Sequence, residues 1–314
     1  MPRSEPDPLR VGIVGAGLLG SAHAGVVSAS PHAVLKAVAE PRPAVGRQVV
    51  AGTGATWYPD CARMLKSEEL DVVIIATPDP LHKEPVIASA RAGIPYILTE
   101  KPLATTRSDA LRMRDAILKS GSQLYVLFPN RFSPLDRAVH YAFQKKLIGA
   151  PVYGDVRLDD NISVPTNLWG KRSREWAVGS STAHFLFSHV VDLLRWYCRP
   201  AEIVEVRALT QQRVLKYSPD LYEAHLAFDN GLVVRTKSEW IRRMDALVEF
   251  ELGFSGKAGS LYYRKLPAFR AQAGLRIDLD SATSGSLSPH QKALAGRGIR
   301  GRIVSDPKAR TPAA

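Results

Sequence analysis

Hydrophobic positions in the first part of the chain fall into short continuous runs separated by amphipathic stretches. The apolar runs cover 9–14, 34–39, 71–76, 94–98 and 123–127, and the helical stretches include 18–28, 81–92 and 108–119. Runs that are apolar on both faces and alternate with helices are typical of a parallel sheet between two helical layers. The sequence therefore predicts an α/β protein with an N-terminal Rossmann-type, doubly wound parallel sheet.

The pattern changes after about residue 150. A helix of mixed character is expected over 182–197, and long alternating segments follow at 202–210, 222–228, 232–240 and 246–254. Asp229-Asn230-Gly231 has the composition of a hairpin turn. These features indicate a C-terminal α/β domain with a large open, mainly antiparallel sheet, one face of which is covered. We expect a disordered lead at 1–8, a Rossmann domain at 9–128, the second domain at 129–267 and a basic, flexible segment at 268–314.

Composition excludes several classes of protein. The 314 residues, 45% of them hydrophobic, suit a globular protein of two domains. No apolar run reaches the roughly 18 residues of a membrane span, and the polar, Pro-rich N-terminus has no signal core. Cys61 and Cys198 are far apart, which argues against a disulfide framework or a metal site. We expect a cytoplasmic protein without a metal or a membrane partner.

The formal charge of +12 raises the question of a nucleic-acid partner. Most of the excess lies in residues 264–314, which hold ten Lys or Arg against three Asp in a stretch without periodic apolar positions. A solvated tail is the simpler explanation, so nucleic acid is not an expected partner.

A glycine-rich turn follows the first apolar run and opens the first helix. It reads Gly15-Ala16-Gly17-Leu18-Leu19-Gly20. The first glycine of G-x-G-x-x-G permits the tight turn, the second lets the backbone approach a diphosphate, and the third allows close helix–strand packing. The N–H groups at the helix start favour the anion. The alternative is a turn of the same shape without a ligand.

Glu40 ends the second apolar run, twenty residues after Gly20. A carboxylate there accepts hydrogen bonds from both ribose hydroxyls of NAD and repels the 2′-phosphate of NADP. Arg42 follows closely and partly offsets that repulsion. We therefore predict NAD as cofactor, with NADP possible.

Two further segments follow the third and fourth apolar runs, at the edge of a parallel sheet where ligands bind. They contain the remaining candidate cofactor residues Thr77, Pro78, His82, Glu100, Lys101 and Pro102. A partly desolvated Lys101 would have a lowered pKa and could exchange a proton with a substrate hydroxyl. Taken alone, Lys101 could equally be an ordinary loop lysine.

In order and spacing, the chain resembles the glucose–fructose oxidoreductase and inositol dehydrogenase (Gfo/Idh/MocA) family. The matching segments are the turn at 15–20, Ala76-Thr77-Pro78 with His82 and Glu84, Ala92-Gly93-Ile94, Glu100-Lys101-Pro102-Leu103-Ala104, Asn130-Arg131-Phe132, and His189-x-x-Asp192 with Trp196. The resemblance covers about residues 9–260. It implies hydride chemistry on sugars, polyols or related cyclic alcohols, and a homodimer or homotetramer formed through the second sheet.

The resemblance also implies site residues. Lys101 matches the family's catalytic lysine, and His189 the histidine that often serves as acid or base. Asp192 lies one helical turn beyond His189. Phe185 stands where the family's dehydrogenases usually have an aspartate, with His184 beside it. A purely structural pairing of His189 with Asp192 is the alternative.

The substrate residues expected from these patterns are Lys101, Arg131, Trp169, Arg172, His184, His189 and Asp192. The basic cluster within 161–176 suggests a carboxylate or phosphate on the substrate, although a solvated charged loop fits as well.

The sequence thus predicts an NAD(P)-dependent oxidoreductase that moves a hydride to or from a secondary alcohol of a sugar, polyol or sugar acid. His189 would take the hydroxyl proton while Lys101 stabilises the developing oxygen charge. Two alternatives remain open: a sugar or dinucleotide sensor without turnover, suggested by Phe185, and a glycosidase that recycles its NAD.

Overall fold

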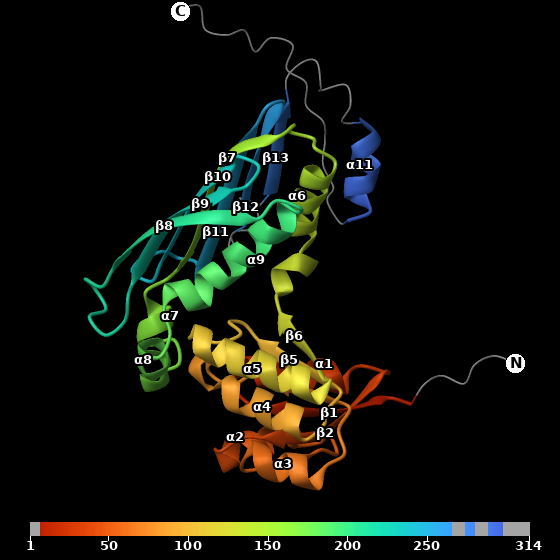
Figure 1. Ribbon diagram of the computed structural model, residues 1–314. Coiled ribbons are helices and arrows are strands. Elements are labelled where there is room, and N and C mark those ends of the chain that lie inside the picture. The colour runs from red at the N-terminus through yellow and green to blue at the C-terminus, as the bar shows by residue number, and fades with distance from the viewer. Residues whose placement is uncertain (1–6, 266–273, 280–287, 298–314) are drawn as a thin grey trace, which may run out of the picture. The chain divides into compact units, whose positions relative to one another are not determined.

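The computed structural model describes residues 7–265, 274–279 and 288–297, arranged in two compact units. The first unit comprises Met1–Phe128 and Val178–Ser180, and the second Pro129–Ala177 and Ser181–Ala314. Each unit is described by itself below (Figure 1). The N-terminal lead up to residue 6 and most of the basic C-terminal segment lie outside the described residues.

The first unit contains a six-stranded parallel sheet, as the sequence predicts. The strand order is β3(Thr56–Tyr58), β2(Ala33–Ala39), β1(Leu9–Val14), β4(Val72–Ile75), β5(Tyr96–Glu100), β6(Gln123–Leu127). Because all strands run the same way, their carboxyl ends share one edge of the sheet. The glycine-rich turn after β1 and the loops after β4 and β5 therefore meet at that edge.

Helices cover both faces of this sheet. One face packs against α1(Leu18–Ser28) and α2(Pro43–Val50), and the other against α3(Cys61–Ser67), α4(Lys83–Arg91) and α5(Arg107–Ser120). The bounds of α1 match the prediction, and those of α4 and α5 differ from it by one or two residues at each end. The prediction missed α2, β3 and α3, which are short elements between longer periodic ones.

The second unit contains a seven-stranded mixed sheet, mostly antiparallel. Its order is β13(Gly274–Leu279), β12(Gly259–Lys265), β11(Val248–Gly256), β7(Pro151–Asp160), β10(Val233–Glu239), β9(Leu221–Phe228), β8(Ile203–Gln211). Among the strands that the structure describes in this sheet, β7 and β10 pair in parallel and the other neighbours are antiparallel. The β9–β10 hairpin is present, and Gly231 in its turn has a φ of 86°. β13 lies within the segment predicted to be flexible, and it forms the edge of the sheet beside β12.

One face of this sheet carries the core of the unit. Buried residues of β7, β10 and β11 and the fully buried Trp240 pack in one cluster with residues of α6(Pro134–Gln144) and α9(Ser188–Tyr197). The described residues of this unit also form α7(Ser163–Thr166), α8(Lys171–Val178) and α11(Ser288–Ala295). Tyr141 of α6 contacts His290 of α11, with 2.8 Å between Oη and Nδ1.

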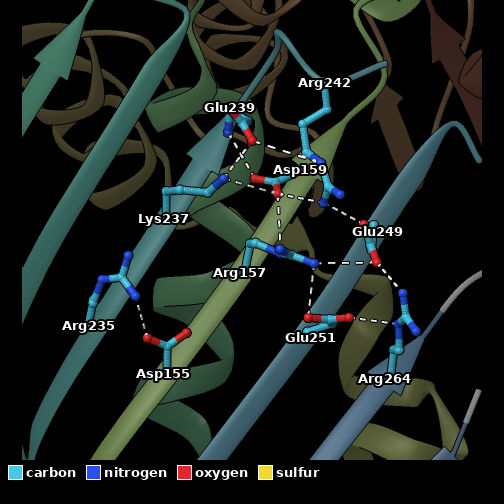
Figure 2. A network of polar contacts seen from close by, with 10 residues as sticks. All are labelled: Asp155, Arg157, Asp159, Arg235, Lys237, Glu239, Arg242, Glu249, Glu251 and Arg264. Carbon is cyan, nitrogen blue, oxygen red and sulfur yellow. Dashed lines mark hydrogen bonds and ion pairs between the residues drawn. The ribbon is translucent and has the colours of Figure 1, made fainter. Parts of the chain in front are cut away.

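The opposite face of the sheet is lined by alternating charges rather than apolar side chains (Figure 2). Arg157 is 2.9 Å from Glu251 and 3.3 Å from Asp159, which Lys237 also approaches to 3.3 Å. Burial raises the pKa of Asp159, and Lys237 opposes that shift. The residues labelled in Figure 2 include both signs in equal number, and Glu223 adds a further carboxylate 3.1 Å from Arg235. The polar composition of this face therefore does not require apolar contacts to cover it.

No helix among the described residues has the length and apolar character needed to cross a membrane. Within the same residues, no group of three or more His, Cys, Asp or Glu side chains is arranged to hold a metal ion.

Asp136 in the first turn of α6 has no exposed surface, and Tyr197 Oη donates a hydrogen bond to it at 2.8 Å. Burial raises the pKa of Asp136 above its ordinary value. The folded state therefore holds this proton more tightly than the unfolded state, and the resulting stability is lost as pH rises through the folded pKa.

We expect Asp136→Asn, which retains an acceptor for Tyr197, to raise the Tm at pH 8 by a few degrees and to flatten the dependence of Tm on pH. Thermal unfolding from pH 4 to 8 measures both effects. An equal or lower Tm of the variant at pH 8 would contradict the prediction. Asp115→Asn, on the exposed side of α5, is the matched control.

Candidate functional site

The glycine-rich turn joins β1 to α1, and each of its glycines has a different structural reason. Gly15 has a φ of +92°, and an added Cβ would lie 2.7 Å from the Ala76 carbonyl oxygen. At Gly20 a Cβ would lie 1.8 Å from the Gly15 carbonyl oxygen. At Gly17 it would meet nothing within 4 Å. Gly15 and Gly20 are therefore required by the fold, whereas the space above Gly17 is open for a ligand.

The start of α1 suits an anionic group. Its N-cap residue, Gly17, offers no side chain to the N–H groups of the first turn. These N–H groups and the helix dipole favour a phosphate. Leu18 and Leu19 directly above the turn are 71% and 46% exposed, unusual for leucines at a helix start. The turn thus fits the diphosphate of a dinucleotide.

Glu40 closes the turn from the end of β2. Its Oε2 accepts a hydrogen bond from the Ala16 N–H at 2.9 Å, and its Oε1 accepts one from Arg42 Nε at 2.5 Å. Burial disfavours the charged form, but the hydrogen bonds from Arg42 and Ala16 outweigh it and lower the pKa of Glu40. An ionised carboxylate therefore stands beside the turn, as ribose recognition requires. In the structure, Arg42 already occupies part of the hydrogen-bond-accepting capacity of the Glu40 carboxylate.

His82 ties the loops after β4 and β5 together. Its Nδ1 lies 2.7 Å from the Pro102 carbonyl oxygen and its Nε2 2.9 Å from the Thr77 carbonyl oxygen, and the residue is 1% exposed. A neutral imidazole donates from one nitrogen only, so both hydrogen bonds form together only in the doubly protonated ring. The ring positions the backbone at Thr77 and Pro102, and its direct contact with a cofactor stays a prediction.

Lys101 follows the last residue of β5 and is 7% exposed. The preceding residue, Glu100, is also buried. Its Oε1 lies within hydrogen-bond distance, 2.8 Å, of Nε2 of His23 in α1. Lys101 is therefore not a solvated loop lysine, and it lies at the same sheet edge as the glycine-rich turn. Pro78, the other proline predicted here, precedes the single turn Asp79–Leu81.

A segment from far along the chain completes this edge of the first unit. Ser180, one of the three residues Val178–Ser180 that belong to it, donates a hydrogen bond to Asp79 Oδ2 at 2.6 Å. Both residues are buried. Sequence reasoning missed this contact, because a hydrogen bond across 101 residues leaves no trace in local spacing.

The second unit contains a cavity of about 330 Å³. His189 lines it from α9, Phe185 from the π-helical turn Ala183–Phe187, and Trp169 from the segment before α8. The predicted continuous helix at 182–197 is thus interrupted by a wider turn, a feature frequent at functional sites. The spacing of four residues brings Phe185 and His189 to the same cavity.

Aromatic side chains fix Phe185 in the wall. Its ring centroid is 4.7 Å from that of Trp176 and 6.3 Å from that of Trp240, and Trp176 in turn contacts Trp169 at 5.3 Å. His184 points to a different partner, since its Nδ1 is 3.0 Å from Ser181 Oγ.

Asp192 pairs with Arg131 rather than with His189. Two hydrogen bonds of 2.8 and 2.5 Å join the guanidinium to the carboxylate, and the Arg131 guanidinium lies 5.9 Å from the Trp196 ring. The predicted substrate residues Arg131 and Asp192 therefore form an ion pair with each other. Arg172 is exposed on α8. Substrate contact by these three residues stays a prediction.

The cavity also has lining residues that sequence reasoning missed. Asn130, Asp160 and Lys265 supply polar atoms, and Leu158 and Phe250 supply apolar wall. The alternation of polar and apolar residues in Asp155-Val156-Arg157-Leu158-Asp159 was the available signal for this strand.

Comparison with known proteins places the first unit within a described family. The profile of the oxidoreductase family with an NAD-binding Rossmann fold (Gfo/Idh/MocA) matches residues 9–128. The inositol 2-dehydrogenase of Acidothermus cellulolyticus is 31% identical over 218 residues, which are 68% of this chain and 60% of that protein. The levoglucosan dehydrogenase of Pseudarthrobacter phenanthrenivorans is 29% identical over 198 residues, 60% of this chain and 50% of that protein. The chain thus spans only half to three fifths of these relatives.

Solved structures share the fold over most of the chain. The WlbA dehydrogenase of Bordetella pertussis, solved in complex with NADH and UDP-GlcNAcA, superposes with a TM-score of 0.78 at 23% identity. The match covers 93% of this chain and 83% of that one. At this identity the likeness establishes the fold.

Proposed function

We propose, from the premise that the chain belongs to the Gfo/Idh/MocA oxidoreductase family, that it is an NAD-dependent dehydrogenase acting on a secondary alcohol. The substrate class would be sugars, polyols or sugar acids, in keeping with relatives named inositol and levoglucosan dehydrogenases. One observation carries the proposal: buried Lys101 follows β5 at the sheet edge that also holds the open glycine-rich turn after β1.

The first unit would hold the cofactor. The N–H groups of the turn at 15–20 bind the diphosphate, with Leu18 and Leu19 against it, while Glu40 accepts from the adenosine ribose. Thr77, Pro78, Glu100 and Pro102 form the loops on the nicotinamide side. When bound, the nicotinamide supplies the carbon that accepts or returns the hydride. NADP remains compatible with the neighbouring Arg42.

Two side chains would handle the proton and the developing charge. Lys101 donates a hydrogen bond to the alcohol oxygen and stabilises the charge that develops on it. His189 takes the hydroxyl proton during oxidation and returns it during reduction. Arg131, Trp169, Arg172, His184 and Asp192 are the further substrate residues of this proposal.

A thermal-shift screen tests the proposal. NAD and NADP are each combined with a panel of sugars, polyols and uronates, and every pair that raises the Tm jointly is assayed for nicotinamide reduction. We expect at least one pair to do both. Binding of NAD with no turnover on any alcohol would favour a sensor, which the apolar Phe185 beside His189 also suggests. Release of product from a glycoside without net nicotinamide absorbance would favour a glycosidase.

We further propose that the chain forms a homodimer or homotetramer through the charged face of the second sheet. A face on which acidic and basic side chains alternate suits an isologous contact, in which the same patch meets its own copy. Tyr153 and Tyr262, 42% and 46% exposed, add apolar contact on this face. A light-scattering mass equal to that of one chain would contradict this proposal.

We place the protein in the cytoplasm. Cys61 and Cys198 are both free thiols, and burial raises the pKa of each, to about 11 and about 12. Unreactive, unpaired thiols are ordinary in a reducing compartment.

A further inference from the structure

The wall of the cavity in the second unit has few groups for a polyhydroxylated ligand. Among the described residues, Asn130, Asp160, His189 and Lys265 are the polar lining residues, and the others are aliphatic, aromatic or proline. The apolar wall includes Leu158, Leu186, Leu247, Val248 and Phe250, together with Phe185 and Trp169.

Asn130, Asp160 and Lys265 make hydrogen bonds within the unit. The indole N–H of Trp240 donates to Asp160 Oδ2 at 3.2 Å, and Lys265 Nζ donates to Asn130 Oδ1 at 3.1 Å. These contacts hold the three side chains in place in the wall. His189, which the proposed function assigns to proton transfer, is the remaining polar residue of the wall.

The size of the cavity exceeds what a single small apolar ring needs. An engineered apolar cavity of roughly 150 Å³ accepts benzene. A cavity of about 330 Å³ therefore has room for a ring alcohol together with an apolar substituent. Burying a hydroxyl without a partner is unfavourable, whereas burying a methylene is favourable. The wall thus selects for apolar surface on the ligand.

We infer that this cavity binds an alkyl or aryl group of the substrate, so that a sugar or polyol that carries an apolar substituent is preferred over one without it. The inference rests on the proposed function and narrows its substrate class. His189 in the same wall brings the apolar subsite next to the group that would take the hydroxyl proton.

Calorimetric titration of the full chain in the presence of NAD tests the inference with matched ligands. The ligands are myo-inositol, cyclohexanol, and 4-methyl-, 4-ethyl- and 4-propylcyclohexanol. We expect myo-inositol to bind most weakly, and each added methylene to lower the Kd by about fourfold, equivalent to ~0.8 kcal/mol. Tightest binding by myo-inositol, or a Kd that does not change with alkyl length, overturns the inference.

Two variants separate this subsite from general hydrophobic adsorption. Leu247→Thr changes a cavity residue that is 53% exposed, and Leu209→Thr changes one on β8 that is 51% exposed and does not line the cavity. Leu247→Thr should flatten the dependence on alkyl length, and Leu209→Thr should leave it intact. Equal effects of the two variants also overturn the inference. Because the side chains of Leu247 and Leu209 are both about half exposed, neither substitution is expected to disturb folding.

Nicotinamide reduction, measured on the same ligands and on a sugar panel, distinguishes the two proposals. Alkyl-dependent binding without reduction of NAD by any alcohol contradicts the proposed function and leaves the subsite supported. Reduction of NAD by free polyols, with no alkyl dependence of binding, supports the proposed function and overturns the subsite.

Discussion

Replacing Lys101 with alanine is expected to lower kcat by roughly 10²–10⁴-fold while NAD still binds. The amine is buried at the end of β5, where its hydrogen bond to a substrate oxygen would strengthen as charge develops on that oxygen. Such an interaction acts mainly in the transition state, so its loss falls on kcat more than on KM. Turnover is followed by nicotinamide absorbance and NAD affinity by calorimetry.

Two further variants guard against a purely structural effect. Lys101→Met retains most of the aliphatic stem that packs in this buried position, so it should fold with a Tm near that of the wild type and remain inactive. Lys36→Ala removes an exposed lysine from β2 of the same sheet and should leave kcat unchanged. Full turnover by Lys101→Met would remove Lys101 from the reaction.

Gly17→Ala is expected to weaken NAD binding by about 10–100-fold without a change in Tm. A methyl group at Gly17 meets no protein atom within 4 Å, and the residue has an ordinary φ of −71°, so the fold tolerates it. The methyl group would instead occupy the space through which a diphosphate approaches the N–H groups of α1. Charge-assisted hydrogen bonds of this kind contribute about 1.5–3 kcal/mol each.

The same helix supplies both controls for Gly17→Ala. Gly25→Ala also adds a methyl group with nothing within 4 Å, but further along α1, and should leave NAD affinity unchanged. At Gly20 the added Cβ would overlap the Gly15 carbonyl, so Gly20→Ala should lower the Tm itself. Unchanged NAD affinity in Gly17→Ala would mean that the turn serves packing alone.

The first unit was largely predictable because its neighbouring strands β1 and β4 are continuous apolar runs that are mostly buried. The glycine-rich turn was predictable for a related reason, since its spacing is set by backbone geometry within one strand–helix unit. α2 was missed because its eight residues make only about two helical turns, and β3 because its three residues carry no period.

Contacts across the sequence were the part that local patterns did not contain. Helical spacing placed His189 and Asp192 one turn apart, and the structure retains that spacing, yet Asp192 takes Arg131 as its partner from 61 residues earlier. Phe185 likewise stood out in the sequence only as an unexpected residue type. Its packing against Trp176 and Trp240 depends on three separate segments that meet only after folding.

The return of Val178–Ser180 to the first unit bears on how this protein can be rearranged. A clean exchange of modules at residue 128 would leave Asp79 buried without the hydroxyl of Ser180, an energetically unfavourable state for a carboxylate. A natural or engineered chimaera can join a different second unit to this first unit. That second unit must then supply a hydrogen-bond donor for Asp79 in place of Ser180. Residues 178–180 lie within the sequence of the second unit but belong to the first, so the two units cannot be separated by a single cut in the sequence.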